Sequence, residues 1–283
     1  MDRRRLLTDL LLFTAITFAI TWLVVGVYIW RPEEMTELFG PMRLGAPAFY
    51  VAVYAPSVTA LLLTAIRYGR RGLTDLLASV VRVRAAWKWI AISVFGFAGL
   101  WLVVSLIEAA ARGNLAAFDD TPWLVALPLV ILGGHILTDP GALGEELGWR
   151  GFALPRLLLF LDARSAALFL GVVWAVWHLP AFYVGSLSQS AYEFLPFVLR
   201  VTAYSVFMTW LFVNTRGSVL WAGIVPHMFF NAVSNAGIQP VGWISILAGV
   251  VIAVLAGRHM RGIGKPAASL PQFRVLDSAA RAA

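Results

Sequence analysis

The chain has 283 residues, of which 60% are hydrophobic and 13% are charged, and its formal net charge is +7. A soluble domain does not need so apolar a composition, whereas apolar runs of about 18 residues or more are typical of membrane-spanning helices. The sequence contains no cysteine, which excludes both a disulfide framework and a thiol nucleophile.

Apolar segments predict eight membrane-spanning helices. The first is too long for a signal-peptide core and has no small-residue cleavage site at its end, so we expect it to be retained. In the fourth, Asp139-Pro140-Gly141 predicts a break or kink. The eight segments are residues 6–30, 46–66, 89–107, 123–156, 165–184, 194–213, 217–236 and 240–257.

Two further segments complete the expected organisation. Residues 72–87 are typical of an amphipathic surface helix that carries Arg82 and Arg84. We expect residues 1–257 to form a single transmembrane domain, an all-α polytopic bundle, and residues 258–283 to form a loose basic tail that includes His259.

The positions of arginine and lysine predict the orientation. With the N-terminus inside, 18 basic residues fall on the inner side, and 3 (Arg31, Arg43 and Arg112) fall on the outer side. This bias follows the positive-inside rule for eight crossings with both termini in the cytoplasm. The net positive charge therefore indicates topology and contact with anionic lipid headgroups, not nucleic acid.

Ionisable and amide side chains recur inside three predicted spans. Charged residues in the middle of a bilayer cost at least about 2.5–3.5 kcal/mol and usually face the interior of the bundle. The fourth span contains Glu145, Glu146 and Arg150, the fifth contains Trp174 and His178, and the seventh contains His227 and Asn231. Counting from the predicted inner ends of the spans, Glu145, His178 and His227 lie at depths of about 16, 20 and 15 Å.

Spacing within these spans predicts which side chains pair. Residues four apart lie on one face of a helix, so Glu146 and Arg150 are expected to form a structural salt bridge. Glu145 is turned by about 100° from Glu146 and cannot share that arrangement equally. Glu145 is therefore the carboxylate expected to react.

Two mechanisms fit this set of residues. In the preferred one, Glu145 and His178 activate a water molecule, while His227 and Asn231 donate hydrogen bonds to the oxygen of an attacked carbonyl, and no cofactor is needed. In the other, Glu145, His178 and His227 bind zinc and leave one position for water. The preference rests on Asn231, because asparagine is a rare zinc ligand but a good oxyanion donor.

These residues resemble the CAAX-protease and bacteriocin-processing (Abi) family of intramembrane endopeptidases. The family pattern is EExxxR, then an aromatic residue four positions before a histidine, then HxxxN on successive helices. Here the three motifs run from Glu145 to Arg150, from Trp174 to His178 and from His227 to Asn231, within residues 123–236. The resemblance implies that Glu145 and His178 activate water, that His227 and Asn231 hold the oxyanion, and that Glu146 and Arg150 brace the site.

The resemblance leaves the metal and the substrate open. Family members have been described both as zinc proteases and as metal-independent glutamic proteases. Eukaryotic members trim prenylated CAAX proteins, whereas the composition of this chain looks prokaryotic, which favours peptide maturation, bacteriocin immunity or membrane-protein turnover. We therefore expect a multi-pass protein of a prokaryotic plasma membrane that acts on a peptide or membrane protein.

Rival functions remain for the same residues. A proton-coupled transporter would also bury glutamate and histidine, although no inverted repeat is visible. A membrane scaffold would use these residues only to lock helices together. Outside the motifs, Asp9 is expected at the inner interface, and His135 and Asp139 are expected either to support the site or to satisfy the kinked backbone.

Overall fold

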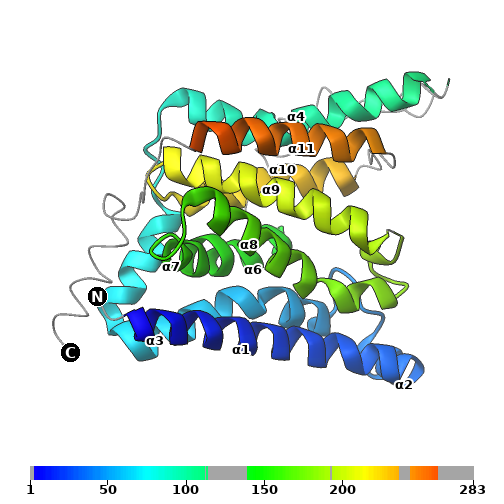
Figure 1. Cartoon of the computed structure of the whole chain (residues 1–283). Coiled ribbons are helices and arrows are strands. Elements are labelled where there is room, and N and C mark those ends of the chain that lie inside the picture. The colour runs from blue at the N-terminus through cyan, green and yellow to red at the C-terminus, as the bar shows by residue number, and fades with distance from the viewer. Residues whose placement is uncertain (1–2, 112, 114–138, 192, 236–242, 261–283) are drawn as a thin grey trace.

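The computed structural model describes residues 3–111, 113, 139–191, 193–235 and 243–260. All regular structure in these residues is helical, with no strand, as expected for an all-α protein. The longer helices run roughly parallel to one another, and α6 and α8 lie between α1 and α3 on one side and α9, α10, α11 and α4 on the other (Figure 1). The helices with α labels are α1 (Arg3–Trp30), α2 (Pro32–Phe39), α3 (Pro47–Val80), α4 (Trp87–Ala111), α6 (Pro140–Glu146), α7 (Leu154–Leu157), α8 (Ala163–Trp177), α9 (Phe194–Asn214), α10 (Val225–Asn235) and α11 (Trp243–Met260).

Two π-helices and two 3-10 helices complete the regular structure of the described residues. The π-helix η3 (Leu147–Ala153) joins α6 to α7, and the π-helix η6 (Leu220–Ile224) leads directly into α10. The 3-10 helices are η4 (Leu179–Tyr183), directly after α8, and η5 (Ser188–Ala191). π-Helical turns are rare and occur often at functional sites.

Four helices in the described part of the chain are long and apolar enough to cross a membrane. These are Arg3–Trp30, Pro47–Val80, Ala163–Tyr183 and Phe194–Asn214. Residues 114–138, which hold nearly half of the predicted fourth span and His135, lie outside the described residues. The protein is thus a multi-pass helical membrane protein.

Two predicted boundaries are wrong. Helix α3 bends at Gly69, which has a φ of 62° and a ψ of −160°, and its second part ends at Val80, so Arg82 and Arg84 lie beyond it. Helix α11 continues to Met260, past the predicted boundary at residue 257. His259 therefore belongs to this helix, where its Nδ1 accepts a hydrogen bond of 2.9 Å from the Trp210 indole.

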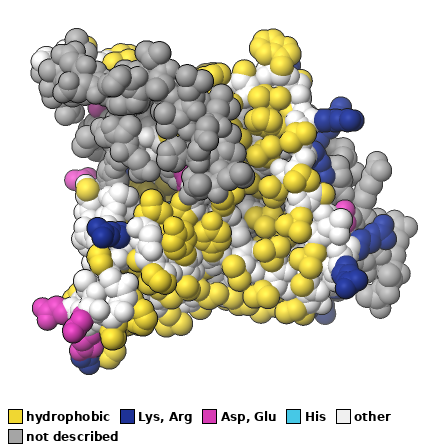
Figure 2. Space-filling model, turned by 180° about the vertical axis from the view of Figure 1, so that it is seen from behind, with side chains coloured by type: hydrophobic (Ala, Val, Ile, Leu, Met, Phe, Trp, Pro, Cys, Tyr) yellow, Lys and Arg dark blue, Asp and Glu magenta, His cyan; other side chains and the backbone are white. Residues whose placement is uncertain are grey.

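Helix α1 turns a stripe of residues toward the bundle, and this stripe includes polar side chains. The stripe comprises Leu6, Asp9, Phe13, Thr17, Thr21, Val25 and Tyr28, three or four residues apart. Leucines on other faces of α1, such as Leu11 and Leu23, are exposed, as expected for a helix in lipid. Figure 2 shows the opposite face of the molecule from Figure 1, where apolar side chains cover a broad area, most basic side chains lie toward one end and acidic side chains lie mainly at the other.

Asp9 is fully buried at the junction of α1, α3 and α7. Its carboxylate accepts a hydrogen bond of 2.8 Å from Arg67 Nε and a second one from the Tyr68 hydroxyl, and Arg156 Nε lies 3.8 Å away. The cluster thereby connects the first helix to the end of the segment that carries the EExxxR motif.

Candidate functional site

The segment GEELGWRG packs unusually closely against α3, and its glycines make this possible. A Cβ atom on Gly148 would lie 2.6 Å from three atoms of Pro56, and a Cβ atom on Gly144 would lie 2.8 Å from the Val53 carbonyl oxygen. Small residues are enriched where helices approach each other in membranes for this reason. One side of the segment is thus held against α3.

Glu146 forms the expected ion pair with Arg150 and also contacts the third motif. Its Oε1 atom lies 2.9 Å from Arg150 Nη1 and 2.8 Å from His227 Nδ1. The side chains of Glu146 and Arg150 are fully buried. Gly223 of η6 gives Glu146 its room, because a Cβ atom there would lie 2.8 Å from Oε2. Glu146 of α6 therefore links Arg150 of η3 to His227 of α10.

Glu145 has a different partner from its neighbour. Its Oε2 atom accepts a hydrogen bond of 2.6 Å from the Trp174 indole nitrogen, and the residue is only 4% exposed. The face of the same indole holds the Arg150 guanidinium, 4.1 Å from the ring centroid. Trp174 therefore supports both Glu145 and Arg150.

His178 follows the last residue of α8 and is oriented by the backbone. Its Nδ1 lies 2.8 Å from the Trp174 carbonyl oxygen. Because a carbonyl oxygen only accepts, Nδ1 carries the proton, and the neutral ring keeps Nε2 as an acceptor. Trp177 and Phe197 pack edge-on against the ring, at centroid distances of 4.7 and 5.2 Å.

Asn231 lies on the same face of α10 as His227 and is bound to Asp139. Its Nδ2 atom lies 3.2 and 3.1 Å from the two carboxylate oxygens of Asp139. Asp139 also caps α6, because its Oδ1 atom accepts from the backbone N–H of Ala142 at 3.1 Å. His135 and Asp139 precede the EExxxR motif, and of these two the structure describes Asp139, which contacts the cluster.

The structure brings the three motifs into one buried cluster. Trp174 is central to it, with ring centroids 6.0 Å from His178 and 5.5 Å from His227. Tyr204 of α9 was missed by sequence reasoning, since no motif marks it. It is buried against the rings of Trp174 and His227, at 6.1 and 6.4 Å.

A metal ion does not fit this arrangement of the donors. Within the described ranges, no three His, Cys, Asp or Glu side chains converge closely enough to hold one ion, and this applies to Glu145, His178 and His227. We therefore derive no step through a metal.

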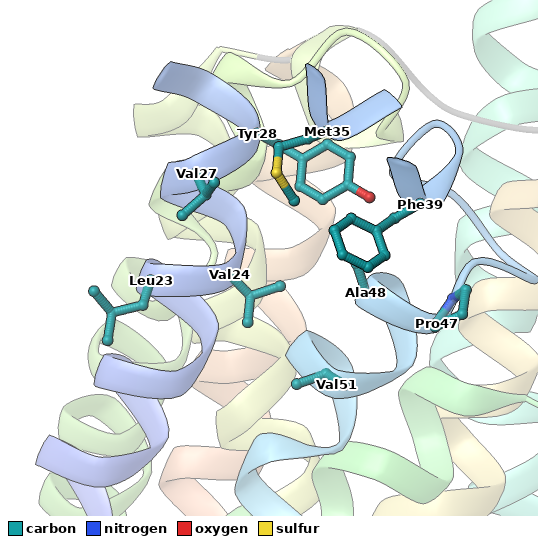
Figure 3. A pocket seen from close by; sticks show the side chains of 9 residues that line it. All are labelled: Leu23, Val24, Val27, Tyr28, Met35, Phe39, Pro47, Ala48 and Val51. Carbon is teal, nitrogen blue, oxygen red and sulfur yellow. The ribbon is translucent and has the colours of Figure 1, made fainter. Parts of the chain in front are cut away.

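An apolar pocket of about 410 Å³ lies elsewhere, between α1, α2 and α3. Figure 3 shows Tyr28, Met35 and Phe39 around it, with Val24 and Val51 on the facing helices. None of the residues in the three motifs lines it.

The fold and the cluster define a multi-pass helical membrane protein with a buried centre of carboxylates and imidazoles. Residues 120–233 match the family model described as Type II CAAX prenyl endopeptidase Rce1-like. A segment of 93 residues is 31% identical to CAAX prenyl protease 2 of Methanococcus maripaludis and covers 31% of this chain and 34% of that protein. The chain thus matches about a third of the length of this relative. The matched region contains all three motifs, and both similarities are to CAAX prenyl proteases, in agreement with the resemblance noted in the sequence.

Proposed function

We propose that the protein is an intramembrane endopeptidase that hydrolyses a peptide bond with an activated water molecule. The observation that carries this proposal is the burial of Glu145 beside Trp174, in the same cluster as His178, His227 and Asn231. The family of the matched region supports the reaction class.

The water would lie between Glu145 and His178. The Trp174 indole already donates a hydrogen bond to Oε2 of Glu145. Oε1 therefore takes the proton from the water as the resulting hydroxide attacks the carbonyl carbon. His178 holds the water through Nε2, because Nδ1 is bound to the backbone. The proton on Glu145 then passes to the amine that leaves.

His227 and Asn231 would stabilise the oxygen of the tetrahedral intermediate. When the His227 ring is neutral and its Nδ1–H is directed at Glu146, Nε2 carries no proton. Nε2 can therefore donate a hydrogen bond to the oxyanion only when the ring is an imidazolium. Glu146 is the carboxylate that balances this charge, and Arg150 in turn balances Glu146. This chain of contacts supports a bracing role for Glu146 and Arg150.

Substitution of Glu145 by glutamine tests the proposal. Glutamine still accepts the indole hydrogen bond but does not take a proton at neutral pH, so we expect cleavage to fall by about 10²–10⁴-fold. The assay uses purified protein in liposomes and a quenched fluorescent peptide in which three residues follow a farnesylated cysteine at the C-terminal end. The same peptide without the farnesyl group is measured in parallel. The name of the archaeal relative suggests this probe.

Glu37→Gln is the matched control, because it makes the same chemical change at an exposed position of α2. Full cleavage by Glu145→Gln would refute the role of this carboxylate. Stoichiometric zinc in the active protein, with inhibition by a chelator, would favour the zinc protease with Glu145, His178 and His227 as ligands. Ion flux without cleavage of either peptide would favour a transporter.

We also infer eight membrane crossings, with both termini in the cytoplasm of a prokaryotic cell. The excess of basic residues on one side supports this orientation. Arg3, Arg4 and Arg5 begin α1, while Glu33, Glu34 and Glu37 lie on α2 directly after the other end of that helix.

A further inference from the structure

We infer that Asp139 is a positioning residue, which holds the Asn231 amide so that one N–H is directed at substrate. This inference rests on the proposed function. The distances from Asn231 Nδ2 to the two Asp139 oxygens are nearly equal, 3.2 and 3.1 Å. Because a carboxylate only accepts, the NH₂ end of the amide must face Asp139, and the amide oxygen must face away.

The geometry leaves one amide hydrogen unused by Asp139. Seen from Nδ2, the two carboxylate oxygens subtend only about 40°, while the two N–H bonds diverge by about 120°. One N–H is therefore shared between both oxygens. The other points away from Asp139 and can donate to the oxygen of a tetrahedral intermediate.

Gly141 keeps the space beside this amide open. A Cβ atom on Gly141 would lie 2.9 Å from Asn231 Nδ2 and 3.5 Å from His227 Nε2. Any other side chain would therefore begin between the two nitrogens proposed to hold the oxyanion. Glycine leaves room for a substrate oxygen near both.

Asp139 also fixes α10 relative to α6, because the same carboxylate caps α6 through Ala142 N. Helix α6 ends at Glu146, directly after Glu145, and α10 carries His227 and Asn231. One carboxylate thus ties the start of the helix that holds the proposed base to the helix that holds the proposed oxyanion donors. A purely structural role as a helix cap is the competing explanation.

Asp139→Asn separates the two roles, because asparagine caps helices as well as aspartate but is neutral and offers one acceptor atom. With the farnesylated peptide, we expect kcat to fall about 10-fold, with KM and the melting temperature unchanged. Asn231→Ala should lower kcat by about 10²–10³-fold. In the Asn231→Ala background, Asp139→Asn should have no further effect.

A second variant tests the space instead of the charge. Gly141→Ala leaves the cap in place but puts a methyl group against Asn231 Nδ2, and alanine is favoured over glycine in a helix. We expect a loss of kcat without a loss of thermal stability.

The inference is overturned if the effects of Asp139→Asn and Asn231→Ala on kcat multiply, or if kcat falls only in step with the melting temperature. Wild-type activity in Gly141→Ala would also overturn it. Absence of cleavage by the wild-type protein refutes the proposed function and this inference together. Cleavage that needs Glu145 but shows independent effects at residues 139 and 231 refutes the inference alone.

Discussion

Gly148→Ala is the sharpest test of how the EExxxR segment is held against α3. The added Cβ atom would lie 2.6 Å from the carbonyl carbon, the carbonyl oxygen and the Cβ atom of Pro56. Non-bonded carbon atoms pack at about 3.5–4.0 Å, so the segment and α3 must separate by about 1 Å. Two of the three atoms are backbone, which cannot move aside as a flexible side chain can.

Two opposing effects set the magnitude. Overpacking of this kind costs about 1–3 kcal/mol, and the rigid contact at Pro56 places Gly148→Ala near the upper end. The higher helix propensity of alanine stabilises the folded state by about 1 kcal/mol relative to glycine. We therefore expect a net destabilisation of about 2 kcal/mol, which lowers the melting temperature by about 5 °C. A displacement of about 1 Å of the segment that carries Glu145, Glu146 and Arg150 should also reduce cleavage by about 10²-fold.

Thermal unfolding of the purified protein in detergent, followed by tryptophan fluorescence, measures the first effect, and the peptide assay measures the second. Gly26→Ala is the matched control, because Gly26 lies within α1 and a Cβ atom there would have no neighbour within 4 Å. If both variants melt at the same temperature, the close approach to Pro56 is not a feature of the protein.

Two further predictions concern the cluster and the orientation. Trp174→Phe keeps an aromatic face for Arg150 but removes the N–H that binds Glu145, so we expect kcat to fall about 10–100-fold; an unchanged kcat would exclude this role. Because the chain has no cysteine, the Arg4→Cys and Glu37→Cys variants can each be labelled with an impermeant maleimide on intact cells. We expect only Glu37→Cys to react before the cells are opened, and the reverse result would invert the topology.

Local spacing explains what could be predicted of the site. Glu146 pairs with Arg150, and His227 lies on the same face as Asn231, because residues four apart meet on a helix regardless of the rest of the fold. The ion pair persists although η3 is a π-helix, which the sequence does not reveal. The catalytic roles of these residues stay predictions.

Long-range contacts explain what could not be predicted. Asp9 meets Arg67 and Arg156, and Trp174 meets Glu145, across separations that no periodicity encodes. The end of α3 at Val80 also departs from the apolar pattern, which continues to residue 87. For Asp9 and Trp174 the tertiary partner decides the outcome, and a single sequence does not show that partner.

The two adjacent glutamates differ in the charge of their partners. Glu146 lies against the arginine and a histidine, so its negative charge is compensated on two sides. Glu145 is turned away from that arrangement and receives a hydrogen bond from an indole, which is neutral and keeps its proton. The Trp174 ring meanwhile takes the Arg150 guanidinium on its face, so the arginine is held on the Glu146 side. A carboxylate that is oriented but not neutralised is the one able to take a proton from water, which is why we propose the reactive role for Glu145 and the structural role for Glu146.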